Sequence, residues 1–269
     1  MYTGVLKKMG FQHNADSYEI APHYFLELNG EQIEMNELVG KSIMLQHTGK
    51  IFCSNCGKVT NKSFGQGFCY PCFISVPETE ECVLKPELCR AHEGIARDMD
   101  FAKKNCLIDQ YVYLALSGGL KVGVTRHHQI PTRWVDQGAS FAIKLVTAPN
   151  RYSAGVIEVE LKKVFADKTN WRKMLTGNDA EEDLVEKKFL ALRALEGKGL
   201  TFSPADDAIF KIIYPVKNFP EKVNSLGFDK QPLIKGVLAG VKGQYLIFDG
   251  GNVFNVRTHT GYQVNLTIS

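Results

Sequence analysis

The chain has 269 residues, with 32 basic and 29 acidic side chains and a formal net charge of +3. Apolar residues make up 44% and charged residues 23%, close to the average of globular proteins, so fibrous and largely disordered chains are excluded. No apolar run approaches the ~18 residues of a membrane helix, and the first residues lack the pattern of a secretory signal. We expect a cytoplasmic protein without a membrane segment.

The first half of the chain divides by composition into three parts. Residues 1–50 read as short strands, with Asn29-Gly30 as a hairpin turn signal. Residues 51–106 are rich in cysteine, and prolines break any long element there. After residue 107 two β-rich runs flank Ser117-Gly118-Gly119, which predicts a hairpin.

The second half continues this core and then returns to strands. The core, residues 107–199, is predicted to hold a short helix over 131–137 and a strand over 141–147. Two helices follow in the prediction, one capped by Ser153 and one from about Asp179 to Leu195, with Glu181 in its first turns. Residues 200–269 are predicted to be β-rich and to pair with 1–50 in one barrel or sandwich.

The seven cysteines all lie between residues 53 and 106. The first four form two Cys-x-x-Cys pairs, separated by twelve residues: Cys53, Cys56, Cys69 and Cys72. Each pair can wrap one side of an ion, so together they predict a structural, four-sulfur zinc ribbon. Because no coordination position stays open, this zinc is expected to hold structure and not to perform chemistry.

The remaining cysteines have a less regular spacing. Cys82, Cys89 and Cys106, with His92 as a nitrogen ligand, predict a second zinc site of the Cys₃His type. The alternative is a set of small buried thiols packed under a loop.

Between Leu120 and Arg151 the chain is basic. Five basic residues (Lys121, Arg126, Arg133, Lys144 and Arg151) and one acid (Asp136) give this stretch a charge of five minus one, or +4. His127 could donate to phosphate and Trp134 could stack on a base. The alternatives are a solvated charged face and a tryptophan that anchors the core.

The order of features in this core resembles that of GIY-YIG nucleases. The resemblance is carried by Val112-Tyr113-Leu114, Lys121-Val-Gly-Val-Thr125, Arg133 and Ala154-Gly-Val-Ile-Glu158. It implies that Tyr113 matches the first motif tyrosine, Gly123 the second motif glycine, Arg133 the arginine that stabilises the phosphorane, and Glu158 the ligand of Mg²⁺ or Mn²⁺. Such residues suit phosphoryl chemistry because a guanidinium and a hard cation meet the developing negative charge.

Lys121 departs from the GIY-YIG pattern, because it stands where the second motif tyrosine should be. A lysine with a lowered pKa could act as a base, whereas a charged lysine would bind phosphate as a point charge. The catalytic candidates are therefore Tyr113, Lys121, Arg133 and Glu158. The candidates for nucleic-acid binding are Lys121, Arg126, His127, Arg133 and Trp134.

Nearly the whole chain also resembles an uncharacterised bacterial family that joins a cysteine-rich segment to this core. The stretches that carry this resemblance are Phe52-Cys-Ser-Asn-Cys-Gly57, Lys85-Pro-Glu-Leu-Cys89, Leu120-Lys-Val-Gly-Val-Thr-Arg126, Thr132-Arg-Trp-Val-Asp-Gln-Gly-Ala139 and Val241-Lys-Gly-Gln-Tyr-Leu-Ile-Phe-Asp249. This family implies no assigned activity.

The sequence thus predicts an α+β protein with a GIY-YIG-like core, an inserted zinc ribbon and a β-rich unit built from both termini. The expected function is binding of DNA or RNA in a basic cleft, with metal-dependent phosphodiester cleavage as a further possibility. The alternative from another class is a non-catalytic module whose zinc ribbon contacts a protein or ribonucleoprotein partner.

Overall fold

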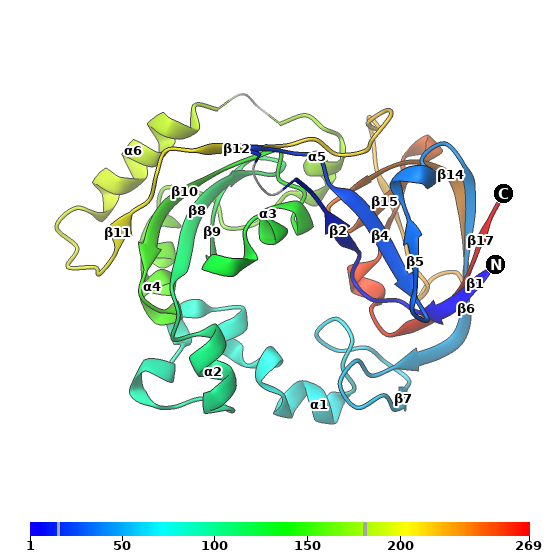
Figure 1. Ribbon diagram of the computed structural model, residues 1–269, viewed down its shortest axis with the longest axis horizontal. Helices are drawn as coiled ribbons and strands as arrows, with labels where there is room; N and C mark the ends of the chain where they lie inside the picture. The colour runs from blue at the N-terminus through cyan, green and yellow to red at the C-terminus, as the bar shows by residue number, and fades with distance from the viewer. Residues whose placement is uncertain (15–16, 180–181) are drawn as a thin grey trace. The chain divides into compact units, whose positions relative to one another are not determined.

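The structure, a computed structural model, describes residues 1–14, 17–179 and 182–269. The chain forms two compact units, coloured along the chain in Figure 1. Unit 1 consists of residues 1–74, 175–177 and 212–269, and unit 2 of residues 75–174 and 178–211. No helix in the described part of the chain has the length and apolar character needed to cross a membrane.

Unit 1 is built around an eight-stranded sheet with the order β1-β17-β6-β14-β15-β16-β13, in which β7 also pairs with β6. A second sheet joins β2, β4 and β5. The strands are β1 (Tyr2–Val5), β2 (Gly10–Gln12), β3 (Glu19–Ile20), β4 (His23–Leu28), β5 (Glu31–Glu34), β6 (Ser42–Phe52), β7 (Val59–Thr60), β13 (Asn224–Leu226), β14 (Leu233–Lys242), β15 (Tyr245–Phe248), β16 (Asn252–Asn255) and β17 (Tyr262–Ile268). The short helices are η1 (Asn36–Leu38), α1 (Tyr70–Ser75), η7 (Asp249–Gly251) and η8 (Arg257–His259).

The two ends of the chain meet in this large sheet. Strand β1 pairs antiparallel with β17, with Tyr2 opposite Leu266 and Val5 opposite Gln263. The strand order starts at β1 and ends at β13, so across the described residues the sheet is open, and of the predicted barrel or sandwich the barrel is wrong. Asn29 and Gly30 turn between β4 and β5 with φ of 52° and 86°, which confirms that hairpin.

Unit 2 joins β12, β10, β8 and β9 in this order, with β11 also on β10. Its strands are β8 (Gln110–Leu116), β9 (Leu120–Arg126), β10 (Phe141–Ala148), β11 (Ser203–Pro204) and β12 (Ile209–Ile212). Its helices are η2 (Pro77–Thr79), η3 (Glu81–Val83), η4 (Pro86–Leu88), η5 (Ala91–Glu93), α2 (Met99–Asn105), η6 (His127–Gln129), α3 (Thr132–Asp136), α4 (Arg151–Leu161), α5 (Trp171–Leu175) and α6 (Leu184–Leu195). The mixed α and β content matches the predicted class.

The core of unit 2 lies between this sheet and helices α4 and α6. Val112 and Leu114 of β8 meet Ile157 of α4 and Ala191 of α6 there, all fully buried. Strand residues alternate between the two faces, so Tyr113 points away from this core. That alternation places Tyr113 beside α3, where its ring meets Trp134 edge-on at 5.9 Å between centroids.

Both predicted helices exist, but their starts differ from the prediction. The side chain of Asn150, not of Ser153, caps α4, because its Oδ1 accepts from the Ser153 backbone N–H at 2.9 Å. Helix α6 begins at Leu184 with Asp183 as its cap. Asp179 instead accepts from the Gly118 N–H at 2.7 Å, and Glu181 lies outside the described residues.

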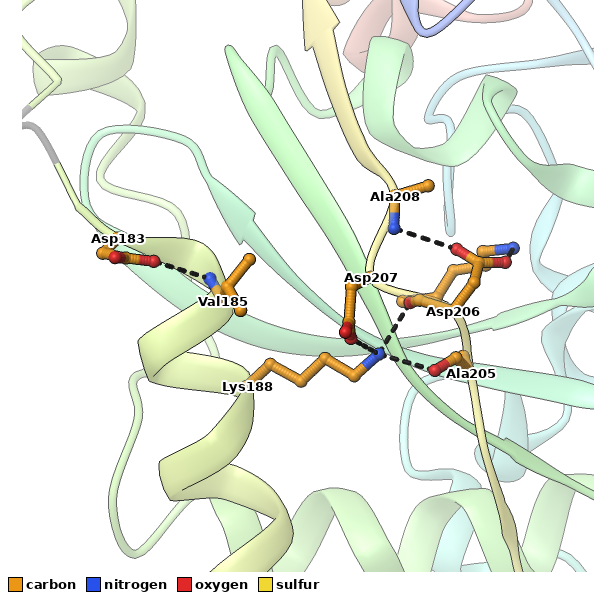
Figure 2. Close-up of polar contacts among 8 residues, drawn as sticks. Asp183, Val185, Lys188, Ala205, Asp206, Asp207 and Ala208 are labelled. Atoms are coloured by element: carbon orange, nitrogen blue, oxygen red, sulfur yellow. Dashed lines mark hydrogen bonds and ion pairs between the residues drawn. The ribbon is translucent and has the colours of Figure 1, made fainter.

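A buried lysine fastens α6 to the connection before β12 (Figure 2). Lys188 is 3% exposed, and its Nζ donates to the carbonyls of Ala205 at 2.7 Å and Asp206 at 2.6 Å. It also forms an ion pair with Asp207 at 2.8 Å. The three acceptors satisfy the ammonium, which is the condition under which a buried charge is tolerated.

Candidate metal centres and hairpin site

The four cysteines of the two Cys-x-x-Cys pairs converge in unit 1. Their sulfurs all lie within 4.8 Å of one another, and this first cysteine cluster (Cys53, Cys56, Cys69 and Cys72) could hold a metal ion. The Cys56 and Cys69 sulfurs are 3.8 Å apart. Metal–sulfur bonds of about 2.3 Å in a tetrahedron place the sulfurs about 3.8 Å apart, so the spacing fits a four-sulfur site.

The local backbone explains why the first cluster forms. Gly57 has φ of 70°, a conformation that glycine adopts readily, and its N–H donates to the Cys53 carbonyl at 2.9 Å. Burial raises the pKa of Cys53, but backbone hydrogen bonds to its sulfur outweigh burial and bring the pKa to about 6. A lowered pKa favours the thiolate of Cys53, which is the form that binds metals. At Cys72 a hydrogen bond from Asn55 lowers the pKa, but hydrogen bonds with the other sulfurs and burial outweigh it and raise the pKa to about 12.

The second cysteine cluster (Cys82, Cys89 and Cys106) forms in unit 2. Its three sulfurs also lie within 4.8 Å of one another and could hold a metal ion, and all three residues are buried. His92 does not belong to this group. Its ring stacks on Tyr152 with 4.4 Å between centroids, so the structure brings together three of the four predicted ligands.

The predicted hairpin over residues 111–125 is confirmed, and its register sets the geometry of the candidate catalytic residues. In the pairing of β8 with β9, Tyr113 lies opposite Gly123 and Ala115 opposite Lys121. Because strand residues alternate in period two, Tyr113 and Lys121 share one face. We call Tyr113, Lys121, Arg133 and Glu158 the hairpin site.

Gly123 is required by the tyrosine opposite it. A Cβ at this position would lie 2.7 Å from the Tyr113 hydroxyl oxygen, closer than side chains approach one another. The Tyr113 hydroxyl in turn donates to Gln137 Oε1 at 3.0 Å. The ring is therefore held between β9 and the end of α3. Burial raises the pKa of Tyr113, and the nearby Arg133 guanidinium opposes that rise.

Lys121 is the most unusual member of the hairpin site. It is 4% exposed, and its Nζ donates to Thr169 Oγ1 at 2.6 Å. Burial, assisted by the positive charge of Arg133, lowers the pKa of Lys121 to about 7. The carboxylates of Glu158 and Asp167 pull the pKa back up, by a smaller amount. A lysine with such a lowered pKa exists in both the charged and the neutral form near neutral pH.

Glu158 lies on α4 and is 8% exposed. Burial raises its pKa, whereas Lys162, one turn further along the helix, lowers it. The two side chains form an ion pair at 3.4 Å, and Lys162 also reaches Asp167 at 3.5 Å. The negative charge of Glu158 raises the pKa of both Tyr113 and Lys121. Its carboxylate therefore lies close enough to interact electrostatically with both side chains.

The structure places the residues predicted to bind nucleic acid in different environments. Arg126 donates to Asn105 Oδ1, and His127 is exposed with its Nδ1 3.2 Å from the Asp109 carbonyl. Trp134 is fully buried against Tyr113 and Phe210. A ring without exposed surface cannot stack on a base, so Trp134 anchors the core and the prediction of a stacking role is wrong.

Four further residues of the site were not foreseen from the sequence. Gln137 binds Tyr113, Thr169 binds Lys121 and Lys162 binds Glu158, while Asp167 forms an ion pair with Lys162. Thr169 lies 48 positions from the lysine that it binds. No spacing pattern in the sequence links Asp167 or Thr169 to the hairpin, because the segment after α4 brings them back to it.

Comparison with known proteins identifies the family. Residues 40–264 match the profile of a family described as a protein of unknown function, DUF2797. The chain belongs to this family. The prediction of an uncharacterised family is thereby confirmed, and the matched range contains both cysteine clusters and the hairpin site. No curated protein and no solved structure matches the chain, so the GIY-YIG likeness stays a prediction.

Proposed function

We propose that this protein binds the phosphates of nucleic acid at the hairpin site. The observation that carries the proposal is the state of Arg133, which is half-buried and forms no ion pair with any carboxylate in the described part of the chain. Among the described residues, no ion pair is formed by the neighbouring buried or half-buried cations Lys121 and Arg126 either, whereas Lys144, Lys162 and Lys188 each pair with an acid. A buried cation without a counter-charge is costly, and a bound anion would remove that cost.

The cations of the site also repel one another. Arg133 lowers the pKa of Lys121 and, after burial and Arg151, that of Arg126 as well. Like charges held together in this way favour an anionic ligand. A phosphodiester fits best, because the planar guanidinium matches phosphate geometry and its charge is permanent.

We further propose phosphodiester cleavage as an activity of the same site. Glu158 supports it, because a carboxylate lies near the cations that would hold a phosphate. Mg²⁺ or Mn²⁺ keeps several waters and needs only one or two carboxylates, so Glu158 fits this role if its ion pair with Lys162 opens. When bound, such an ion would stabilise charge on the phosphoryl oxygens. Lys121, whose pKa is lowered to about 7, could in its neutral form accept a proton from the attacking water.

We propose Zn²⁺ as the ion of the first cysteine cluster, where it would hold structure. Four sulfur ligands select zinc over harder cations, and they leave no position for a substrate. Around this cluster Val59, Tyr70 and Ile74 are exposed, by 61%, 56% and 53%. These side chains support the alternative of a zinc ribbon that contacts a protein or ribonucleoprotein partner, without chemistry of its own.

Fluorescence anisotropy tests the binding proposal. Labelled single- and double-stranded DNA and RNA are titrated with the wild type, Arg133→Ala and Arg193→Ala. Arg193 is exposed on α6 and lies over Phe189, so its variant makes the same charge change elsewhere in unit 2. We expect Arg133→Ala to weaken binding about tenfold and Arg193→Ala to have little effect. Equal effects of the two variants would contradict the proposal.

A cleavage assay with Mg²⁺ or Mn²⁺ on the same nucleic acids tests the second proposal. Glu158→Gln keeps the size of the side chain and removes the charge that a cation needs. We expect this variant to lose cleavage and to retain binding. Binding without cleavage in the wild type would leave an anion site that does not perform the reaction, and absence of both would favour the interaction module.

A further inference from the structure

The second cysteine cluster lies in a segment with little regular structure. Cys82 is in η3, Cys89 ends η4 and Cys106 ends α2, and these elements come from a stretch made mostly of single 3₁₀ turns. The apolar groups that accompany the three thiols are mostly alanines, namely Ala91, Ala102 and Ala96, together with Met99. So small an apolar cluster provides little hydrophobic stabilisation, and three converging sulfurs suggest a cross-link through an ion.

The peptide groups of this cluster hold Arg151, the first residue of α4. The Arg151 Nε donates to the Cys82 carbonyl at 2.7 Å, and an Nη donates to the Val83 carbonyl at 2.9 Å. The backbone N–H of Arg151 donates to the Cys106 carbonyl at 2.8 Å. Two of the three cysteines therefore fix the start of the helix that carries Glu158.

The same segment also holds Arg126 and the middle of α4. Arg126 donates to the side chain of Asn105, the residue directly before Cys106. On α4, a Cβ at Gly155 would lie 2.1 Å from the backbone nitrogen of Glu87 and 2.4 Å from the carbonyl carbon of Pro86. The backbone of η4 thus packs directly on the helix, one turn before Glu158.

We propose that Cys82, Cys89 and Cys106 bind a thiophilic divalent cation such as Zn²⁺, and that this ion keeps Arg126, Arg151 and α4 in the arrangement that binds an anion. Three thiolates and one nitrogen or oxygen ligand complete the coordination. The first half of the proposal, the ion, stands by itself. The second half, its effect on anion binding, rests on the proposed function.

Metal analysis of the purified full-length chain tests the ion. We expect two zinc ions per chain in the wild type, one in Cys89→Ser and one in Cys56→Ser. Because a cysteine variant can fail to fold, X-ray absorption of the zinc-loaded wild type is the second measurement. A mixture of one four-sulfur site and one site with three sulfurs and one light atom is expected, an average of 3.5 sulfurs per zinc. A single zinc per chain, lost in Cys56→Ser and kept in Cys89→Ser, would overturn the proposal.

Anisotropy with the labelled nucleic acid that the wild type binds best tests the effect on the site. We expect Cys89→Ser to weaken binding about tenfold, as Arg133→Ala does, and Cys56→Ser, which loses an ion from unit 1, to bind as the wild type. Equal binding by the wild type, Cys89→Ser and Cys56→Ser would overturn the second half of the proposal. If the wild type binds no nucleic acid, the proposed function fails, whereas the zinc count still decides whether the second ion exists.

Discussion

At the residue scale, the charge on Lys121 predicts that the proposed nucleic-acid binding depends on pH. Its pKa is lowered to about 7 by burial, so the ammonium is charged below that pH and neutral above it. Only the charged form attracts phosphate. We expect affinity to fall as the pH rises between about pH 6 and pH 8, measured by anisotropy at constant ionic strength.

The control is Lys121→Arg, because a guanidinium stays charged across this range. We expect its affinity to be nearly independent of pH. A pH dependence that persists in Lys121→Arg would contradict the role of Lys121.

Gly155 is the second residue on which the site depends. Its missing side chain lets the backbone of η4 approach α4, and a methyl group there would collide with backbone atoms of Pro86 and Glu87. We expect Gly155→Ala to lower the free energy of unfolding by about 1–3 kcal/mol, despite the better helix propensity of alanine. Val159→Ala changes an exposed position of the same helix and should stay within about 0.5 kcal/mol in the same urea titration.

At the scale of elements, the Lys188 clamp joins α6 to the segment before β12 (Figure 2). Lys188→Met keeps the aliphatic stem but leaves two carbonyls without their donor. We expect a loss of about 2–4 kcal/mol of unfolding free energy. The neighbouring Lys187 pairs with Glu182 at 3.4 Å near the surface, so Lys187→Met should cost less than about 1 kcal/mol. Similar losses in both variants would show that the clamp contributes no more than a surface ion pair.

Elements with strong local signals could be predicted from the sequence. The hairpin turns at Ser117-Gly118-Gly119 because Gly118 and Gly119 have φ of 68° and 135°. Helix starts were less predictable, because Asn150 and Ser153 are both capping residues and only the backbone geometry selects Asn150. The convergence of the first cysteine cluster followed from spacing, whereas the place of His92 on Tyr152 depends on how η5 packs against α4.

At the scale of the whole molecule, the division into units could not be derived from composition. Strands β1 and β17 pair although Tyr2 and Leu266 are 264 positions apart, and the cysteine-rich segment is divided between the two units after Ile74. Such long-range pairing is decided by which apolar faces fit together, and local patterns carry no record of it. The sequence predicted that the two ends are rich in strands and pair with each other, and the pairing of β1 with β17 confirms this, but the order and register of the strands required the structure.

The distribution of charge over the whole chain predicts how binding responds to salt. The stretch from Leu120 to Arg151 carries a charge of +4, whereas the whole chain carries +3. The remaining residues therefore carry −1 and add no general attraction for nucleic acid. If Lys121, Arg126 and Arg133 each neutralise one phosphate, the logarithm of the association constant should fall against the logarithm of salt concentration with a slope of about −2 to −3. Arg133→Ala should make this slope shallower by about 0.7–0.9, because one counterion fewer is released. Anisotropy titrations from low to physiological salt measure both slopes. An unchanged slope in Arg133→Ala would mean that this arginine does not meet a phosphate, even if its loss weakens binding.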